Sequence, residues 1–219
     1  MKRQIILFDL DGTLVESEEG IIKSIQYAAD KLNLPAKTAL ELRPFIGPPL
    51  LEQFMAFYDL DKATAEKAVA FYRERYAPIG VLECQLYPGI KNMLEELKNQ
   101  GFILGVASSK PETFVKQVIE HFDLTENFSA IVGSTFTAER NTKGLVIQEA
   151  IKRLEANPRK DSIVMVGDKE HDAFGAREQQ IPCVAVLYGY GSKEELELAQ
   201  PLQIVESVNE LTKILKKIS

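Results

Sequence analysis

Ile5-Ile6-Leu7-Phe8-Asp9-Leu10-Asp11-Gly12-Thr13 places two carboxylates directly behind an apolar run. The apolar run predicts a buried strand, and the Asp-Gly-Thr that ends the stretch predicts a sharp turn. Asp9 and Asp11 then stand at the carboxyl end of a central strand, the edge at which open α/β sheets bind ligands. Leu10 points to the opposite side, so the two like charges meet in one small site and need a cation or a shared proton. The alternative is a plain turn in which Asp11 serves as an Asx cap.

Further short apolar segments recur along the chain, and after residue 88 helical patterns separate them. Strands that alternate with helices predict a parallel, doubly wound, Rossmann-like α/β sheet. Ser192 and Ser207 are each followed by Glu three positions later, a spacing that predicts helix N-caps. Gly101 follows a helical pattern and predicts its end. The strand candidates lie at about 4–9, 102–107, 129–133, 162–167, 182–187 and 202–205.

Residues 16–84 interrupt this pattern, because they show helical spacing and no strand character. Three apolar faces recur at helical intervals, and prolines and a glycine end two of them. We therefore expect an α/β core formed by residues 1–15 and 85–219, with an inserted all-helical domain at 16–84.

Polar residues follow two later apolar runs. Ser108 ends the run at 102–107, and Asp168 ends the run at 162–167. Asp172 comes four residues after Asp168, so a helix beginning there would turn both toward one point. Lys143 opens a helical stretch after Arg140-Asn141-Thr142. Taken alone, Ser108 would be interpreted as a helix cap and Lys143 as a solvated surface charge.

The four motifs together, in this order, resemble the haloacid dehalogenase superfamily of phosphotransferases. Its signature is Asp-x-Asp-Gly-Thr, a Ser or Thr after a second strand, a lone Lys, and Gly-Asp-x-x-x-Asp. The resemblance covers essentially the whole chain. It implies that the helical insertion is a subclass I cap, which closes over the active site and selects the substrate.

The resemblance also implies a role for each motif. Asp9 would be the nucleophile that forms an aspartyl-phosphate, and Asp11 would protonate the leaving alkoxide and then deprotonate the attacking water. Ser108 would donate a hydrogen bond to a phosphoryl oxygen. Lys143 would neutralise charge on the phosphate and on Asp9.

A magnesium site is implied at the same place. Mg²⁺ would be held by Asp9, the backbone carbonyl of Asp11 and Asp168, with Asp172 in a supporting or water-mediated role. The substrate would also be contacted by residues of the two phosphate-binding turns and of a loop in the insertion, namely Gly12, Ser109, Ile46 and Gly47.

That loop, residues 43–50, resembles the specificity loop of the phosphoglycolate phosphatase-like and bacterial 5'-nucleotidase-like branch. Gly47 and the two prolines after it make a stiff turn, suited to presenting backbone groups to a ligand. An ordinary connection between helices explains the loop equally well. These residues do not decide between phosphoglycolate and a nucleoside monophosphate.

The second carboxylate, Asp11, narrows the choice among the reactions that the superfamily carries out. Dehalogenases of the superfamily lack a residue equivalent to Asp11, and phosphonatases replace it, so hydrolysis of a phosphate monoester is the leading interpretation. A phosphosugar mutase keeps both aspartates and is the alternative enzyme. A phosphate-binding module without catalysis is the alternative of another class, and it fits less well because every catalytic position holds a competent residue.

Composition limits the partners and the compartment. A formal net charge of -6 over 219 residues provides no basic field for a nucleic-acid polymer, whereas a small phosphorylated metabolite needs only a local positive site. Cys84 and Cys183 match no metal-binding spacing. The first apolar segment is too short for a signal peptide or a membrane span, so we expect a cytoplasmic protein without a membrane partner. The oligomeric state stays open.

Overall fold

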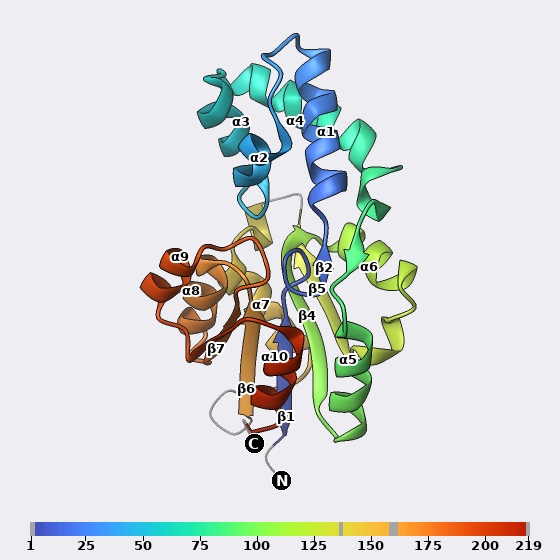
Figure 1. The fold of residues 1–219 in the computed structure, drawn as a ribbon, viewed down its shortest axis with the longest axis vertical. Coiled ribbons are helices and arrows are strands. Elements are labelled where there is room, and N and C mark those ends of the chain that lie inside the picture. Colours follow the sequence, from blue (N-terminus) through green and yellow to red (C-terminus); the bar gives the residue numbers. More distant parts are fainter. Residues whose placement is uncertain (1–2, 136–137, 158–161, 218–219) are drawn as a thin grey trace. The chain divides into compact units, whose positions relative to one another are not determined.

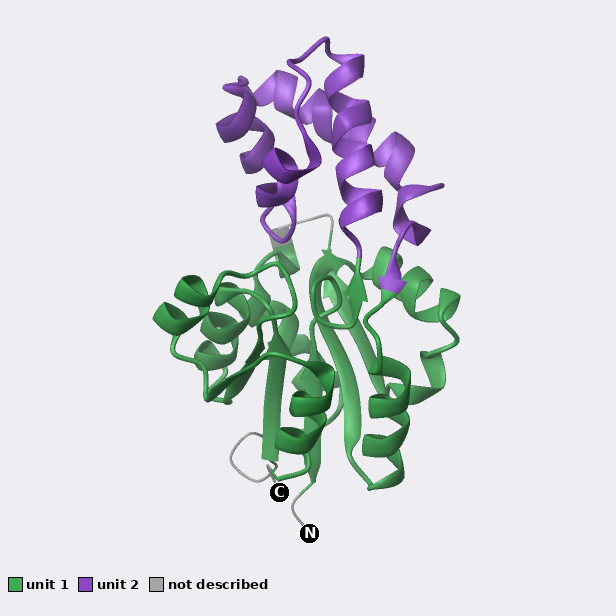
Figure 2. Cartoon of the chain, in the orientation of Figure 1, with its two compact units in different colours: residues 1–16, 86–219 green, residues 17–85 purple. Residues whose placement is uncertain are grey.

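The computed structural model describes residues 3–135, 138–157 and 162–217. Within these residues the chain forms two compact units, residues 1–16 with 86–219 and residues 17–85 (Figure 2). The short strands β2 (Val15–Glu16) and β3 (Gln85–Leu86) pair where the chain leaves the first unit and returns to it. No helix in the described part of the chain has the length and hydrophobicity needed to cross a membrane.

The larger unit is built on a six-stranded sheet in the order β5-β4-β1-β6-β7-β8, and the recorded pairings are all parallel (Figure 1). The predicted α/β fold with a doubly wound parallel sheet is therefore confirmed. The remaining strands are β1 (Gln4–Phe8), β4 (Ile103–Pro111), β5 (Ala130–Ser134), β6 (Ser162–Gly167), β7 (Cys183–Val186) and β8 (Gln203–Val205).

Helices cover both faces of this sheet. Helix α7 packs on β4 and β5 and against α8, α8 packs on β6 and β7 and against α9, and α10 packs beside α5. Ser192 and Ser207 cap α9 and α10 as their spacing predicts, and Gly101 adopts a φ of +88° just after α5. The bounds are α5 (Ile90–Asn99), α6 (Glu112–His121), α7 (Lys143–Arg153), α8 (Glu170–Glu178), α9 (Lys193–Ala199) and α10 (Val208–Leu215).

The smaller unit is helical, and its interior is aromatic. The ring of Phe45 packs edge-on against Phe54 and Phe57, with centroids 5.0 and 5.2 Å apart. Such rings bury large apolar areas in specific geometries, so the interior of this unit is specified by a few side chains. Its helices are α1 (Glu18–Lys31), α2 (Ala39–Leu42), η1 (Arg43–Phe45), α3 (Leu50–Tyr58), α4 (Lys62–Tyr76) and η2 (Gly80–Leu82).

An ion-pair network joins α6 to α7 in the larger unit. The Glu112 carboxylate lies 2.8 Å from the Arg140 guanidinium, 3.0 Å from that of Arg153 and 2.8 Å from the Lys116 ammonium. Burial alone would raise the pKa of Glu112, but Arg153 and Lys116 outweigh it and lower the pKa to about 2. The carboxylate therefore stabilises the fold in its charged form.

We expect Glu112→Gln to lower the free energy of unfolding at pH 7 by about 1–2 kcal/mol, a range reduced for solvent screening. Because the folded-state pKa is depressed, the contribution is complete above the ordinary value of about 4.5 and disappears as the pH falls toward 2. Urea denaturation of both proteins between pH 7 and pH 3 measures this. The variant Glu120→Gln, on the exposed side of the same helix, is the control. A difference that persisted unchanged at pH 3 would contradict the assignment.

Candidate active site

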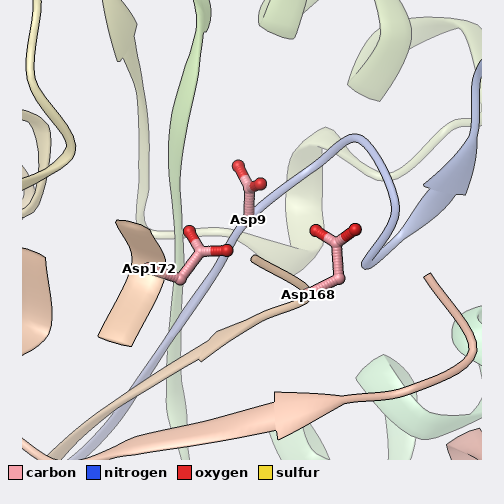
Figure 3. Close-up of side chains that lie close together, drawn as sticks. All are labelled: Asp9, Asp168 and Asp172. Carbon is pink, nitrogen blue, oxygen red and sulfur yellow. The ribbon is translucent and has the colours of Figure 1, made fainter. Parts of the chain in front are cut away.

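Three buried carboxylates meet at the carboxyl edge of the sheet. Asp9 follows β1 and Asp168 follows β6, and the Asp9 amide donates a hydrogen bond to the Val166 carbonyl 2.8 Å away. Asp172 lies in the first turn of α8 and accepts a hydrogen bond from the Lys169 amide at 3.0 Å. Each aspartate offers one oxygen within 4.8 Å of the others, and Figure 3 shows the three side chains gathered around one space.

Lys143 neutralises part of this charge from the first residue of α7. Its ammonium Nζ lies 2.8 Å from Asp9 Oδ1 and 2.7 Å from Asp172 Oδ1, and it donates a hydrogen bond to the Ala107 carbonyl at 2.9 Å. The side chain is 2% exposed, which excludes a solvated surface charge. Burial alone would lower the pKa of Lys143, but Asp172 and Asp9 raise it instead, so the lysine stays charged.

A glycine-rich loop holds Asp168 in place. The Tyr190 amide donates a hydrogen bond to Asp168 Oδ2 at 2.8 Å, and a Cβ at Gly189 would stand 2.4 Å from the Cβ of Asp168. Gly12 approaches from the other side at a φ of +81°, where a Cβ would stand 2.0 Å from Asp168 Oδ2. Only glycine fits either position. Burial, with the charges of Asp172 and Asp9, raises the pKa of Asp168, a cost that a bound cation would relieve.

The carboxylate of Asp11 lies against a different cation. Both of its oxygens accept hydrogen bonds from the Lys110 ammonium, at 2.8 and 2.9 Å.

The sequence did not assign a role to Lys110 or to Tyr190. For Lys110 the available signal was its position directly after Ser108 and Ser109. For Tyr190 it was the Tyr-Gly-Tyr-Gly loop at 188–191.

Ser108 reaches the same edge from β4, the other neighbour of β1. Phe8 pairs with Val106 on β4 and with Val166 on β6, so Ser108 and Asp168 each lie two residues beyond a partner of Phe8. Ser108 is 2% exposed and its hydroxyl accepts a hydrogen bond from the Lys110 amide at 3.3 Å. Helix α6 begins after Pro111 without a side-chain cap, so Ser108 is not a helix cap. Ser109 beside it is half-buried.

The loop at 43–50 belongs to the smaller unit. Phe45 and Ile46 are both 2% exposed, and Phe45 forms part of the aromatic interior described above. Gly47 is exposed and has a φ of +106°, which explains the need for glycine there. The loop can therefore present the backbone at Gly47 more readily than the side chain of Ile46, and a substrate contact at either residue stays a prediction.

The donor set fits a hard divalent cation. Asp9, Asp168 and Asp172 offer only carboxylate oxygens, the ligands that Mg²⁺ prefers, and all three are buried. The four aspartates of this part of the structure, counting Asp11, outnumber the two ammonium groups of Lys143 and Lys110. One divalent cation would balance the excess negative charge.

Comparisons with known proteins agree with this geometry. A family model described as haloacid dehalogenase-like hydrolase matches residues 6–186. A 5'-nucleotidase from Pseudomonas aeruginosa is 38% identical over 213 residues, covering 96% of this chain and 95% of that protein. A phosphoglycolate phosphatase from Xanthomonas campestris is 30% identical over 186 residues, covering 84% of this chain and 83% of that protein. The crystal structure of a predicted phosphatase from Clostridium acetobutylicum is 41% identical, with a TM-score of 0.92 over 99% of this chain and 100% of that one.

Proposed function

The chain belongs to the haloacid dehalogenase-like hydrolase family as a phosphoric monoester hydrolase, and from this premise we propose a magnesium-dependent phosphatase that acts through an aspartyl-phosphate. Its substrates are small phosphate monoesters, either nucleoside 5'-monophosphates or phosphoglycolate. The higher identity and coverage of the 5'-nucleotidase relative favour the nucleotides. The observation that carries the mechanism is the buried ion pair of Lys143 with Asp9, at 2.8 Å, at the edge of a three-carboxylate cluster.

In the first chemical step an Asp9 oxygen attacks phosphorus as the bond from phosphorus to the ester oxygen breaks. Asp11 gives its proton to the departing oxygen. Ser108 donates a hydrogen bond to a phosphoryl oxygen, and Lys143 offsets the negative charge that accumulates there. In the second step water attacks the aspartyl-phosphate, Asp11 takes the proton from that water, and inorganic phosphate and free Asp9 result.

Mg²⁺ would be held by Asp9, Asp168, Asp172 and the Asp11 carbonyl, and would supply charge neutralisation for the phosphoryl oxygens. In the protein itself, Asp168 is oriented for this role by the Tyr190 amide. Asp172 is oriented by the Lys169 amide and by Lys143. Such supporting contacts keep the carboxylates aligned when the cation exchanges.

We propose that the helical unit, residues 17–85, selects the substrate as a cap. The chain enters this unit within a few residues of Asp11 and Thr13, so the insertion departs from the catalytic turn itself. A unit inserted there can recognise the leaving group without supplying the phosphoryl chemistry.

Phosphate release from a panel of nucleoside monophosphates, phosphoglycolate and sugar phosphates tests this function. We expect turnover with Mg²⁺, its loss in excess chelator and its return on adding Mg²⁺. The melting temperature should also rise with Mg²⁺, because a cation that binds only the folded state stabilises it. Full turnover in chelator would contradict the metal assignment. Conversion of glucose 1-phosphate to glucose 6-phosphate with little free phosphate would make the protein a phosphosugar mutase.

A further inference from the structure

Asp11 and Lys110 form a pair that is separate from the three-carboxylate cluster. The Lys110 ammonium contacts both Asp11 oxygens, and the two side chains are only 6% and 16% exposed. The second lysine of the site, Lys143, contacts Asp9 and Asp172 instead. The two cations therefore serve different carboxylates, one beside the nucleophile and one beside the acid.

A shift in the register of β4 accompanies the contact of Lys110 with the Asp11 carboxylate. The pairing of β4 with β5 shifts its register between Ser108 and Pro111, so Ser109 and Lys110 lie in a bulge. Bulges redirect side chains and recur next to active sites. The Lys110 amide also donates a hydrogen bond to the Ser108 hydroxyl, which fixes the bulged backbone beside the phosphate-binding position.

Stability alone does not account for the pair. Taking a lysine and an aspartate out of water costs free energy that their attraction returns only in part, so a buried ion pair is weak evidence of a stabilising role. The pair does fix orientation, because one ammonium that contacts both oxygens restrains the rotation of the carboxylate. Asp11 is two residues from Asp9, and without that restraint its carboxylate would be drawn toward any cation that the cluster held.

We infer, on the basis of the proposed function, that Lys110 is a positioning residue that holds the Asp11 carboxylate beside the departing ester oxygen and apart from the carboxylates of Asp9, Asp168 and Asp172. Asp11 enters this step as the carboxylic acid, with the proton on one oxygen while the other oxygen accepts from Lys110. The bond from Asp9 to phosphorus forms, the bond from phosphorus to the ester oxygen breaks, and the proton moves from Asp11 to that oxygen, which leaves the carboxylate that contacts Lys110 through both oxygens. An alkoxide needs the proton to depart, whereas 4-nitrophenolate departs without one. The loss of kcat/KM on replacing Lys110 should therefore increase with the basicity of the leaving group.

The test compares Lys110→Met with wild type on 4-nitrophenyl phosphate and on the alkyl monoester that wild type hydrolyses fastest. The ratio kcat/KM reports only the steps up to loss of the leaving group. We expect kcat/KM to fall about thirtyfold or more for the alkyl ester, a part of the roughly 100- to 10,000-fold that acid catalysis contributes, and less than about threefold for the aryl ester. Lys110→Arg should restore part of the alkyl activity. Lys116→Met, which removes an exposed lysine of α6, is the matched control.

A double-mutant cycle makes the inference specific to Asp11. If Lys110 acts through Asp11, Lys110→Met should cost no more than about twofold in the Asp11→Asn background. Equal losses on the aryl and alkyl esters would show that Lys110 serves the phosphoryl group, and additive losses in the cycle would show that it acts independently of Asp11. Either result overturns the inference while leaving the phosphatase intact. A wild type that hydrolyses no monoester would instead overturn the proposed function and the inference with it.

Discussion

Asp9→Asn should abolish turnover, with a loss of kcat of at least about a thousandfold, because an amide is a poor nucleophile and no other described carboxylate occupies the same position. The fold should survive the change. Lys143 keeps two of its partners, Asp172 at 2.7 Å and the Ala107 carbonyl at 2.9 Å, so the substitution does not leave a buried ammonium without a counter-charge. The loss would therefore be one of chemistry and not of structure.

Steady-state phosphate release measures the loss, and rapid quenching followed by borohydride reduction and mass spectrometry locates the phosphorylated residue in wild type. We expect the label on Asp9. Asp123→Asn is the matched control, since Asp123 is exposed at a φ of +57°, a conformation that asparagine also adopts. A phosphorylated residue other than Asp9, or an Asp9→Asn enzyme with near-normal turnover, would refute the mechanism.

Lys143→Met should be the second large effect, and it should act on activity and on stability together. Methionine keeps the length of the side chain but removes the charge that faces Asp9 and Asp172. We expect kcat/KM to fall by a similar factor of about a thousand for every monoester, since all of them share the phosphoryl group. Two buried carboxylates left without the ammonium should also lower the free energy of unfolding by about 3–5 kcal/mol.

The double variant Lys143→Met with Asp172→Asn separates the two effects. The Asp172→Asn change removes one of the two buried carboxylates that Lys143→Met leaves unpaired. Part of the free energy of unfolding, measured by urea denaturation, should therefore return, while activity stays at the level of Lys143→Met alone. Lys152→Met is the control on the same helix, because its side chain is 80% exposed. A Lys143→Met enzyme that ranks its substrates in a new order would show that this lysine contributes to specificity, contrary to the assignment.

Much of the fold could be predicted from the chain alone, because its signals are local. A short apolar run bounded by turn residues favours a buried strand, and strands that alternate with helices have few ways to pack. The carboxyl ends of parallel strands share one edge, so residues directly behind the strands had to meet. The resemblance of the ordered motifs to the haloacid dehalogenase superfamily assigned Asp9, Ser108 and Asp168 to one site, and this shared edge is the physical reason that residues so far apart in sequence lie there.

Other features depended on tertiary structure, because they arise from pairs of residues distant in sequence. Nothing near Lys110 identifies Asp11 as its partner, since the contact requires the bulge in β4 and the neighbouring turn after β1. The amide of Tyr190 is an ordinary backbone group until its loop folds over Asp168. Likewise, the burial of the Ile46 side chain, in a loop expected to present backbone groups to a ligand, is seen only in the folded unit. Local sequence specifies the elements and their edge, whereas the direction in which a long or buried side chain points is decided by neighbours that only the packed fold supplies.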